Sequence, residues 1–202
     1  LYAVAPWYAV RQYTQAVRRA GFTLGMLGLE ADALSRALLG EPRKGKATLV
    51  ADIGHRTTTI FVRDASGLRA TFSRPLAGAS MTEAVAAAKK ITVEKAEALK
   101  RKAGVKDGGD ATVRQALVKK ITDLARSIGE VAGWYARVLP ETTLDEVAVT
   151  GGTSEMPGLV AMLQSLLSAD YEGLTVRQAD PFVRVADTVL VKKARAAHKA
   201  AL

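Results

Sequence analysis

Cysteine is absent from the 202 residues, and histidine occurs only twice, as His55 and His198. The missing cysteines exclude disulfides, thiolate metal sites and a cysteine nucleophile. Two histidines so far apart in the sequence do not form the close ligand spacing that is typical of a histidine-based zinc centre. Aromatic residues make up only 5% of the chain, which argues against an aromatic-rich binding module.

Long apolar runs are also missing, because charged residues interrupt every stretch before it reaches the ~20 apolar residues of a membrane helix. Hydrophobic residues make up 49% of the chain and charged residues 24%, a balance that fits one globular domain or two small ones. The chain begins with leucine and carries no visible targeting segment. We therefore expect a piece of a longer, soluble protein, and the lack of cysteine is compatible with the cytoplasm.

Basic residues outnumber acidic residues by 29 to 20, which gives a formal net charge of +9. Such an excess can indicate a nucleic acid, an anionic membrane surface or an acidic partner. The basic residues are spread along the predicted helices and gather only near the C-terminal end, at Lys192, Lys193, Arg195 and Lys199. Because no nucleic-acid-reading motif accompanies them, we predict no nucleic-acid partner and interpret the excess as a solvated basic surface.

The first 46 residues are predicted to hold two helices, 8–20 and 31–39, each preceded by a short strand, 1–5 and 22–29. In the first helix the spacing of Val10, Tyr13 and Val17 predicts a face that packs against the core. The opposite face carries Arg11 and Arg18.

The rest of the chain alternates between strands and helices. Strands are predicted at 47–53, 58–63, 68–73, 146–150 and 174–177. Ser80-Met-Thr-Glu83 predicts a capping box that opens a helix, and a second helix follows over 92–102. A long helix is predicted from one apolar stripe: Val113, Leu117, Ile121, Leu124, Ile128, Val131, Tyr135 and Val138. Strands on both sides of a helical block indicate an α/β fold.

The segment from Asp52 to Thr58 has the composition of an anion-binding turn between two strands. Gly54 lets backbone N–H groups approach phosphate oxygens, and Thr57 and Thr58 supply hydroxyl donors. Asp52, at the end of its strand, can hold a magnesium ion or the water bound to it. The alternative is an ordinary hairpin turn without a ligand.

Two further segments carry weaker signals. Gly151 and Gly152 lie between a strand and a helix, where paired glycines let a nucleotide pack flat against the backbone, although many α/β proteins have such a step without a ligand. Glu97 and Lys100 share one face of a helix, and their simplest interpretation is a surface ion pair.

The order of these segments resembles the actin/Hsp70/sugar-kinase superfamily, and within it the PilM family of type IV pilus assembly proteins. The stretches that carry the resemblance span nearly the whole chain: 21–38, 52–59, 73–83, 96–100, 150–158 and 179–182. The resemblance implies a partial actin-like ATPase (ribonuclease H-like) fold. Residues 1–46 would be the remnant of a first lobe, 47–75 with 144–202 the sheet of a second lobe, and 76–143 a mainly helical insertion.

The resemblance also implies a function. The cofactors would be ATP and magnesium, bound by the phosphate turn (Asp52, Gly54, Thr57 and Thr58), a ribose-contacting helix (Glu97 and Lys100) and an adenosine loop (Gly151 and Gly152). The protein would act as a cytoplasmic scaffold at the inner-membrane platform of the pilus machinery that drives twitching motility. Its partner would be the N-terminal peptide of a PilN-like membrane protein, with Arg11 and Arg18 at that interface, and self-association is possible.

Several departures and alternatives accompany this interpretation. The family's N-terminal strands with the first phosphate loop, and its last C-terminal element, have no counterpart here. His55 and Arg56 stand where the division protein FtsA has glycines, so we expect at most a weak ATPase. A superfamily kinase would need a general base, and no residue identifies one. An FtsA-like filament protein would need an amphipathic membrane helix, and residues 187–202 lack a bulky apolar face.

Overall fold

The computed structural model describes residues 4–41, 43–185 and 188–201, with the side chains at 195 and 197–201 left out. Its centre is a five-stranded sheet in the order β3-β2-β1-β4-β5. β1 (Lys46–Ile53), β2 (Thr58–Asp64) and β3 (Gly67–Arg74) form an antiparallel meander. β4 (Thr143–Thr150) and β5 (Thr175–Gln178) add to β1 in parallel, so the strands that the sequence predicts on either side of the helical block lie in one sheet.

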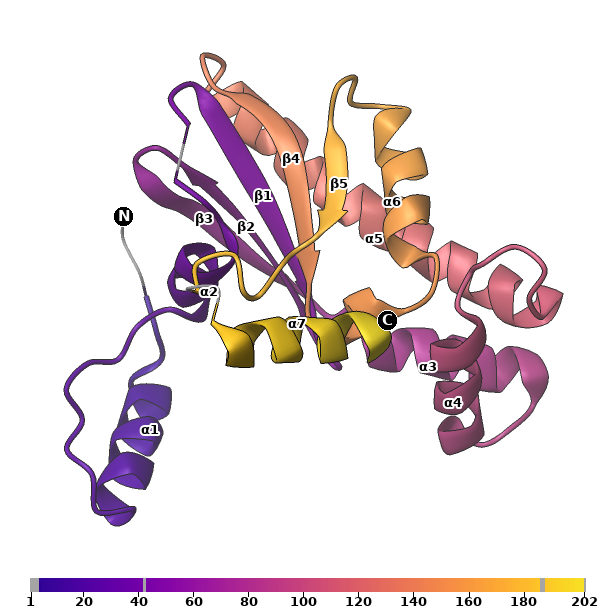
Figure 1. The fold of residues 1–202 in the computed structure, drawn as a ribbon, viewed down its shortest axis with the longest axis horizontal. Coiled ribbons are helices and arrows are strands. Elements are labelled where there is room, and N and C mark those ends of the chain that lie inside the picture. Colours follow the sequence, from indigo (N-terminus) through magenta and orange to yellow (C-terminus); the bar gives the residue numbers. More distant parts are fainter. Residues whose placement is uncertain (1–3, 42, 186–187, 202) are drawn as a thin grey trace.

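Helices cover both faces of this sheet (Figure 1). One face packs on α3 (Gly78–Lys89), α4 (Val93–Ala103), α5 (Ala111–Val138) and α6 (Leu159–Ser168), which share one apolar core with it. α2 (Glu30–Leu38) covers the other face. Side chains alternate along β1 accordingly, with Leu49 and Ala51 in the first core and Val50 in the second. α5 shares this core with the sheet, so the core does not separate the predicted helical insertion, 76–143, from the sheet. The boundaries of that insertion stay a prediction.

The strand predicted over residues 22–29 is wrong, and most of the strand predicted over 1–5 lies outside the described residues. Residues 22–29 form no strand, and neither do Val4 and Ala5, while residues 1–3 lie outside the described part of the chain. A strand needs a neighbouring strand to satisfy the hydrogen bonds of its backbone groups. The five strands of the described sheet pair only with one another, so none of them pairs with residues 22–29. Gly25 and Gly28 further weaken the strand propensity of the second segment.

α1 (Trp7–Arg19) forms as predicted, but the prediction that Val10, Tyr13 and Val17 face the core is wrong. The helix has no buried residue, and 65% of Tyr13 is exposed. Figure 1 shows α1 standing away from the sheet. The helical period is therefore present in the sequence without a packed partner in the described structure.

α3 begins two residues before the predicted capping box. Ser80 lies in the first turn, where its hydroxyl oxygen accepts a hydrogen bond from the Ala77 backbone N–H at 3.3 Å. The earlier start brings Gly78 and Thr82 into the interior of the molecule.

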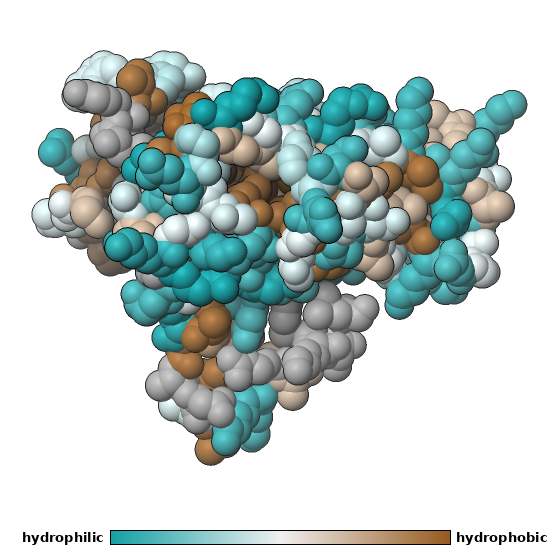
Figure 2. Space-filling view, turned by 90° about the horizontal axis from the view of Figure 1, so that it is seen from above, coloured by the Kyte–Doolittle hydropathy of each residue, from teal (hydrophilic) through white to brown (hydrophobic). Residues whose placement is uncertain are grey.

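The C-terminal helix α7 (Val189–Ala201) exposes Val189 and Leu190, at 71% and 78%. Within the described residues, no helix combines the length and the apolar character needed to cross a membrane. The face seen in Figure 2 is mostly hydrophilic, with hydrophobic residues exposed in separate areas.

Candidate functional site

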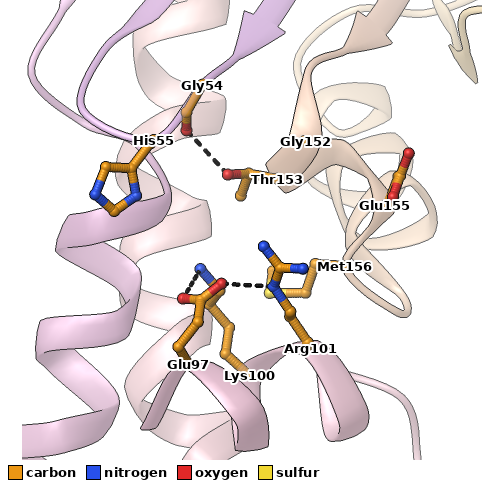
Figure 3. A pocket seen from close by; sticks show the side chains of 9 residues that line it. All are labelled: Gly54, His55, Glu97, Lys100, Arg101, Gly152, Thr153, Glu155 and Met156. Atoms are coloured by element: carbon orange, nitrogen blue, oxygen red, sulfur yellow. Dashed lines mark hydrogen bonds and ion pairs between the residues drawn. The ribbon is translucent and has the colours of Figure 1, made fainter. Parts of the chain in front are cut away.

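Three segments that are far apart in the sequence line one pocket (Figure 3). They are the turn after β1, the middle of α4, and the stretch from Gly152 that forms the short 3₁₀ helix η1 (Gly152–Glu155). The pocket-lining residues are Gly54, His55, Glu97, Lys100, Arg101, Gly152, Thr153, Glu155 and Met156. Four of the eight predicted nucleotide-binding residues, one or two from each predicted segment, are thus brought together.

Gly54 closes the turn between β1 and β2. Its N–H donates to the Thr57 carbonyl at 3.1 Å, and a Cβ at Gly54 would lie 2.9 Å from that oxygen, so the turn has no room for a side chain. The Gly54 carbonyl accepts hydrogen bonds from the Gly78 N–H at 3.0 Å and the Thr153 hydroxyl at 2.9 Å. These two bonds fix the turn to α3 and to η1.

Asp52 lies at the end of β1, paired in register with Thr150 of β4. Burial, followed by the negative charge of Glu30, raises the pKa of the Asp52 carboxyl. No hydrogen bond or ion pair among the described residues engages this carboxylate. Gly151 follows at φ 88°, and a Cβ there would lie 2.5 Å from Asp52 Oδ1. The close approach of backbone and carboxylate therefore depends on glycine.

A single carboxylate fits a magnesium ion that keeps most of its waters and takes its other ligands from phosphate. Among the described residues, no group of three or more metal-ligating side chains gathers at this place or elsewhere. Asp52 offers one carboxylate, which suits a water of a magnesium–nucleotide complex.

Glu97 and Lys100 form a network in the pocket floor rather than a surface pair. Lys100 is 4% exposed, and its Nζ lies 2.7 Å from Glu97 Oε2. The Glu97 carboxylate is 32% exposed and also accepts hydrogen bonds from Arg101 Nε, at 2.8 Å, and from the Thr82 hydroxyl. Burial by itself would raise the pKa of Glu97, but the hydrogen bonds from Lys100, Thr82 and Arg101 lower it to about 2. The pocket therefore holds a carboxylate that stays ionised at every physiological pH.

The remaining predicted residues lie elsewhere. Thr57 is exposed on the turn, and Thr58 is fully buried, with its hydroxyl donating to the Leu76 carbonyl at 2.6 Å. Arg11 and Arg18 line a separate groove on α1. The other residues of this groove are Trp7, Val10, Thr14 and Gln15, and none of the six lines the pocket.

Sequence reasoning missed several residues of the site. Thr153 directly follows the paired glycines, and Arg101 directly follows Lys100. Their positions beside predicted segments could have indicated that they belong to the site. Thr82 was hidden inside the predicted capping box. Gly78 is a point of close approach, because a Cβ there would lie 2.4 Å from the Thr153 hydroxyl and 3.4 Å from Lys100 Nζ. No local pattern in the sequence indicates that contact.

A family model described as cell division protein FtsA matches residues 49–197. Curated protein sequences give no significant match to the chain.

Solved structures share the fold. The PilM–PilN type IV pilus biogenesis complex aligns with 88% of the chain at 24% identity and a TM-score of 0.69, which covers 49% of that protein. The ethanolamine utilization protein EutJ from Carboxydothermus hydrogenoformans aligns with 87% at 26% identity and a TM-score of 0.65, over 57% of its own length. MreB5 of Spiroplasma citri, solved with AMPPNP, aligns with 96% at 14% identity and a TM-score of 0.67, over 68% of its length. The chain thus spans about half to two thirds of these proteins and has the actin-like fold.

Proposed function

Because the chain belongs to the FtsA family of actin-like ATPases, we propose that its pocket is one half of an ATP site and that the protein works as a nucleotide-binding scaffold. The supporting observation is the pocket itself, in which Gly54, Glu97, Lys100 and Gly152 converge from three separate segments. The chain spans only part of its structural relatives. In the proposed site the opposite half corresponds to the part of those relatives that the chain does not cover.

The residues that line the pocket and those that adjoin it (Asp52, Thr57 and Gly151) have distinct roles in this proposal. The backbone of the Gly54 turn and the Thr57 hydroxyl face the phosphates, and Asp52 holds a water of the magnesium ion. Magnesium, when bound, neutralises phosphate charge. The exposed edge of the Glu97 carboxylate accepts hydrogen bonds from ribose hydroxyls, and buried Lys100 keeps that carboxylate in place. Gly151 and Gly152 leave the base free to pack on the backbone.

Turnover in this site is at most slow. The pocket contains His55 from the phosphate turn, and Arg56 next to it is exposed, so two bulky side chains occupy the turn that faces the phosphates. The proposal assigns no residue as the base that would activate a water. Nucleotide then serves to order the protein around the pocket rather than to drive rapid chemistry.

The proposed setting is type IV pilus assembly at the cytoplasmic face of the inner membrane, in support of twitching motility. The support comes from the PilM–PilN complex, whose PilM-type fold the chain shares over 88% of its length. The partner in this proposal is the N-terminal peptide of a PilN-like membrane protein. It would contact Arg11 and Arg18 on α1, and the protein would meet the membrane only through this partner.

A second candidate is a filament-forming role in cell division, which the description of the matching family favours. The two roles differ in what ATP does. A division filament sediments when ATP is added, whereas the pilus scaffold stays in the supernatant and binds a PilN-type N-terminal peptide in a fluorescence titration. Sedimentation without peptide binding would favour the division role.

The nucleotide site is tested by calorimetry with Mg-ATP on the protein as its gene encodes it. Asp52→Ala should weaken binding in magnesium but not in EDTA, and Asp123→Ala, at a partly exposed position of α5 outside the pocket, is the matched control. Gly152→Val should block the base without disturbing the fold, because a Cβ at Gly152 meets no atom within 4 Å. Unchanged affinity in both the Asp52→Ala and the Gly152→Val variant would remove ATP from this pocket.

A further inference from the structure

Thr82 is a buried hydroxyl residue of α3 that lies beneath the pocket without lining it. Only 2% of it is exposed. Its Oγ1 lies 2.9 Å from Lys100 Nζ and 2.9 Å from the Gly78 carbonyl, and it is hydrogen-bonded to the Glu97 carboxylate. Thr82 therefore connects α3 to the Glu97–Lys100 pair of α4.

The hydrogen-bond donors of Lys100 are all used. The buried Lys100 ammonium has three N–H donors and three acceptors around it, namely Glu97 Oε2 at 2.7 Å, Thr82 Oγ1 at 2.9 Å and the Gly78 carbonyl at 3.1 Å. The Thr82 oxygen accepts a hydrogen bond from Lys100. Its single proton has two acceptors within reach, the Gly78 carbonyl at 2.9 Å and the Glu97 carboxylate, and the charged carboxylate is the stronger acceptor. One carboxylate oxygen of Glu97, Oε2, is therefore bonded to both Lys100 and Thr82.

Thr82 also differs from the other partners of Glu97 in its position. Lys100 and Arg101 belong to α4, the helix that carries Glu97 itself, and both move with it. Among the described residues, Thr82 is the hydrogen-bond partner of this carboxylate that comes from another element. It therefore fixes the direction of the carboxylate relative to the rest of the pocket.

We propose that Thr82 is a positioning residue, whose hydroxyl holds the Glu97 carboxylate toward the pocket and so determines the preference of the site for a ribose over a deoxyribose. This inference rests on the proposed function, because Glu97 is the proposed ribose acceptor. A carboxylate held in one orientation accepts a hydrogen bond from a ribose hydroxyl in a fixed geometry. When the Thr82 hydroxyl is removed, the carboxylate keeps only the bonds from its own helix, and its orientation relative to the rest of the pocket is no longer fixed.

The pH dependence of binding follows from the same contacts. The charged groups near Glu97 are Lys100 and Arg101 on its own helix and Glu155 of η1, and the titratable His55 of the turn after β1 also lines the pocket. Loss of the Thr82 hydrogen bond removes one of the three bonds that lower the pKa of Glu97, so this pKa rises. Protonation then begins at a higher pH, and ribose discrimination disappears at a higher pH than in the wild type.

The experiment compares Thr82→Val with Thr82→Ser, which keeps the hydroxyl, on the protein as its gene encodes it. The matched control is Thr122→Val on α5, which removes a hydroxyl that makes the same bond to the carbonyl four residues earlier, at 2.9 Å. The affinities for ATP and for 2′-deoxy-ATP and 3′-deoxy-ATP are measured across the acidic pH range. The pKa of Glu97 is followed separately by carboxyl NMR without nucleotide, with Glu97→Gln to assign the signal.

We expect the wild type, Thr82→Ser and Thr122→Val to prefer ATP over one of the deoxy analogues by roughly tenfold, the effect of one hydrogen bond to a charged group. Thr82→Val should lose most of this preference and show a raised Glu97 pKa. A Thr82→Val protein that is folded by circular dichroism and keeps both the preference and the low pKa would overturn the positioning role.

Two further outcomes separate this inference from the proposed function. If Thr82→Val does not fold, Thr82→Cys replaces it, because a thiol is a weak donor and acceptor. That variant must then reduce the preference, and an unchanged preference overturns the inference. A wild type that binds ATP and both deoxy analogues equally overturns the ribose role, and a wild type that binds no nucleotide overturns the proposed function itself.

Discussion

Helices α1 and α5 both have apolar residues at helical spacing, yet one is surrounded by the molecule and the other is not. α5 is 28 residues long and buries ten of them, whereas the 13 residues of α1 include none that is buried. α5 lies against the sheet and contacts α3 and α6 as well, while α1 stands apart (Figure 1). The comparison teaches that an apolar stripe predicts a helix, and that burial requires a second surface of matching shape.

The largest expected difference is in how much a substitution in each helix lowers the stability of the 202-residue chain. Leu124→Ala in α5 removes a side chain with no exposure and leaves a cavity, so we expect a loss of about 2–5 kcal/mol in the free energy of unfolding. Tyr13→Ala in α1 should change it by less than about 0.5 kcal/mol. Urea unfolding followed by circular dichroism measures both. Equal losses would mean that α1 is packed in solution.

A smaller difference in stability is expected between alanine substitutions at two glycines with positive φ. One glycine lies beside the pocket and the other follows α1. Gly151 beside the pocket and Gly21 after α1 have φ 88° and φ 82°. An alanine Cβ would lie 2.5 Å from Asp52 Oδ1 at Gly151 but would meet nothing within 4 Å at Gly21. Gly21→Ala should therefore cost only about 1 kcal/mol for the backbone conformation, and Gly151→Ala roughly 2–4 kcal/mol because crowding adds to it.

Thermal unfolding of the two glycine variants, side by side, measures this difference. A Gly21→Ala variant as unstable as Gly151→Ala would contradict the open surroundings of the residue that follows α1.

The smallest effect on the fold should come from the exposed charges of α1. Arg11→Glu with Arg18→Glu should leave the unfolding midpoint unchanged, because both side chains are exposed and α1 buries nothing. In the proposed complex the same double variant should slow association with a PilN-type peptide. Salt should reduce the effect, since exposed charges are screened beyond ~8 Å at physiological ionic strength.

Lys119→Glu with Arg126→Glu is the matched control, because both residues are exposed on α5 and have the same seven-residue spacing. Stopped-flow association at low and high salt distinguishes the two pairs. If the α1 variant associates as fast as the wild type at low salt, α1 is not part of the interface.

The sequence was most informative where neighbouring residues decide the outcome. The α5 stripe was predicted residue by residue, and seven of its eight members are buried, while Val138 at the helix end is 54% exposed. The actin-like fold was predicted from the order of short motifs, and the family and structural comparisons confirm it. The strand predicted over 22–29 failed because the propensity of a segment does not supply a pairing partner.

The pocket also combines features that the sequence predicted with features that only the tertiary structure shows. The resemblance assigned Gly54, Glu97, Lys100 and Gly152 to one site, and the structure brings these four to one pocket. Local spacing alone indicated only an ion pair for Glu97 and Lys100. The sequence also predicted a role for Thr58, yet only the sheet shows that this hydroxyl is buried and bonded to Leu76. A hydroxyl in a turn looks the same in sequence whether it faces a ligand or the interior.

The sequence by itself determined the elements that depend on local chemistry: the helical stripe of α5, the β2–β3 hairpin and the glycine turn after β1. The tertiary structure alone decided which distant groups meet. Thr82 and Glu97 are 15 residues apart, and Gly54 and Thr153 are 99 apart. Such contacts depend on strand register and on how α3 and α4 pack against each other. No short stretch of sequence encodes either, because both result from the whole chain burying its apolar surface at once.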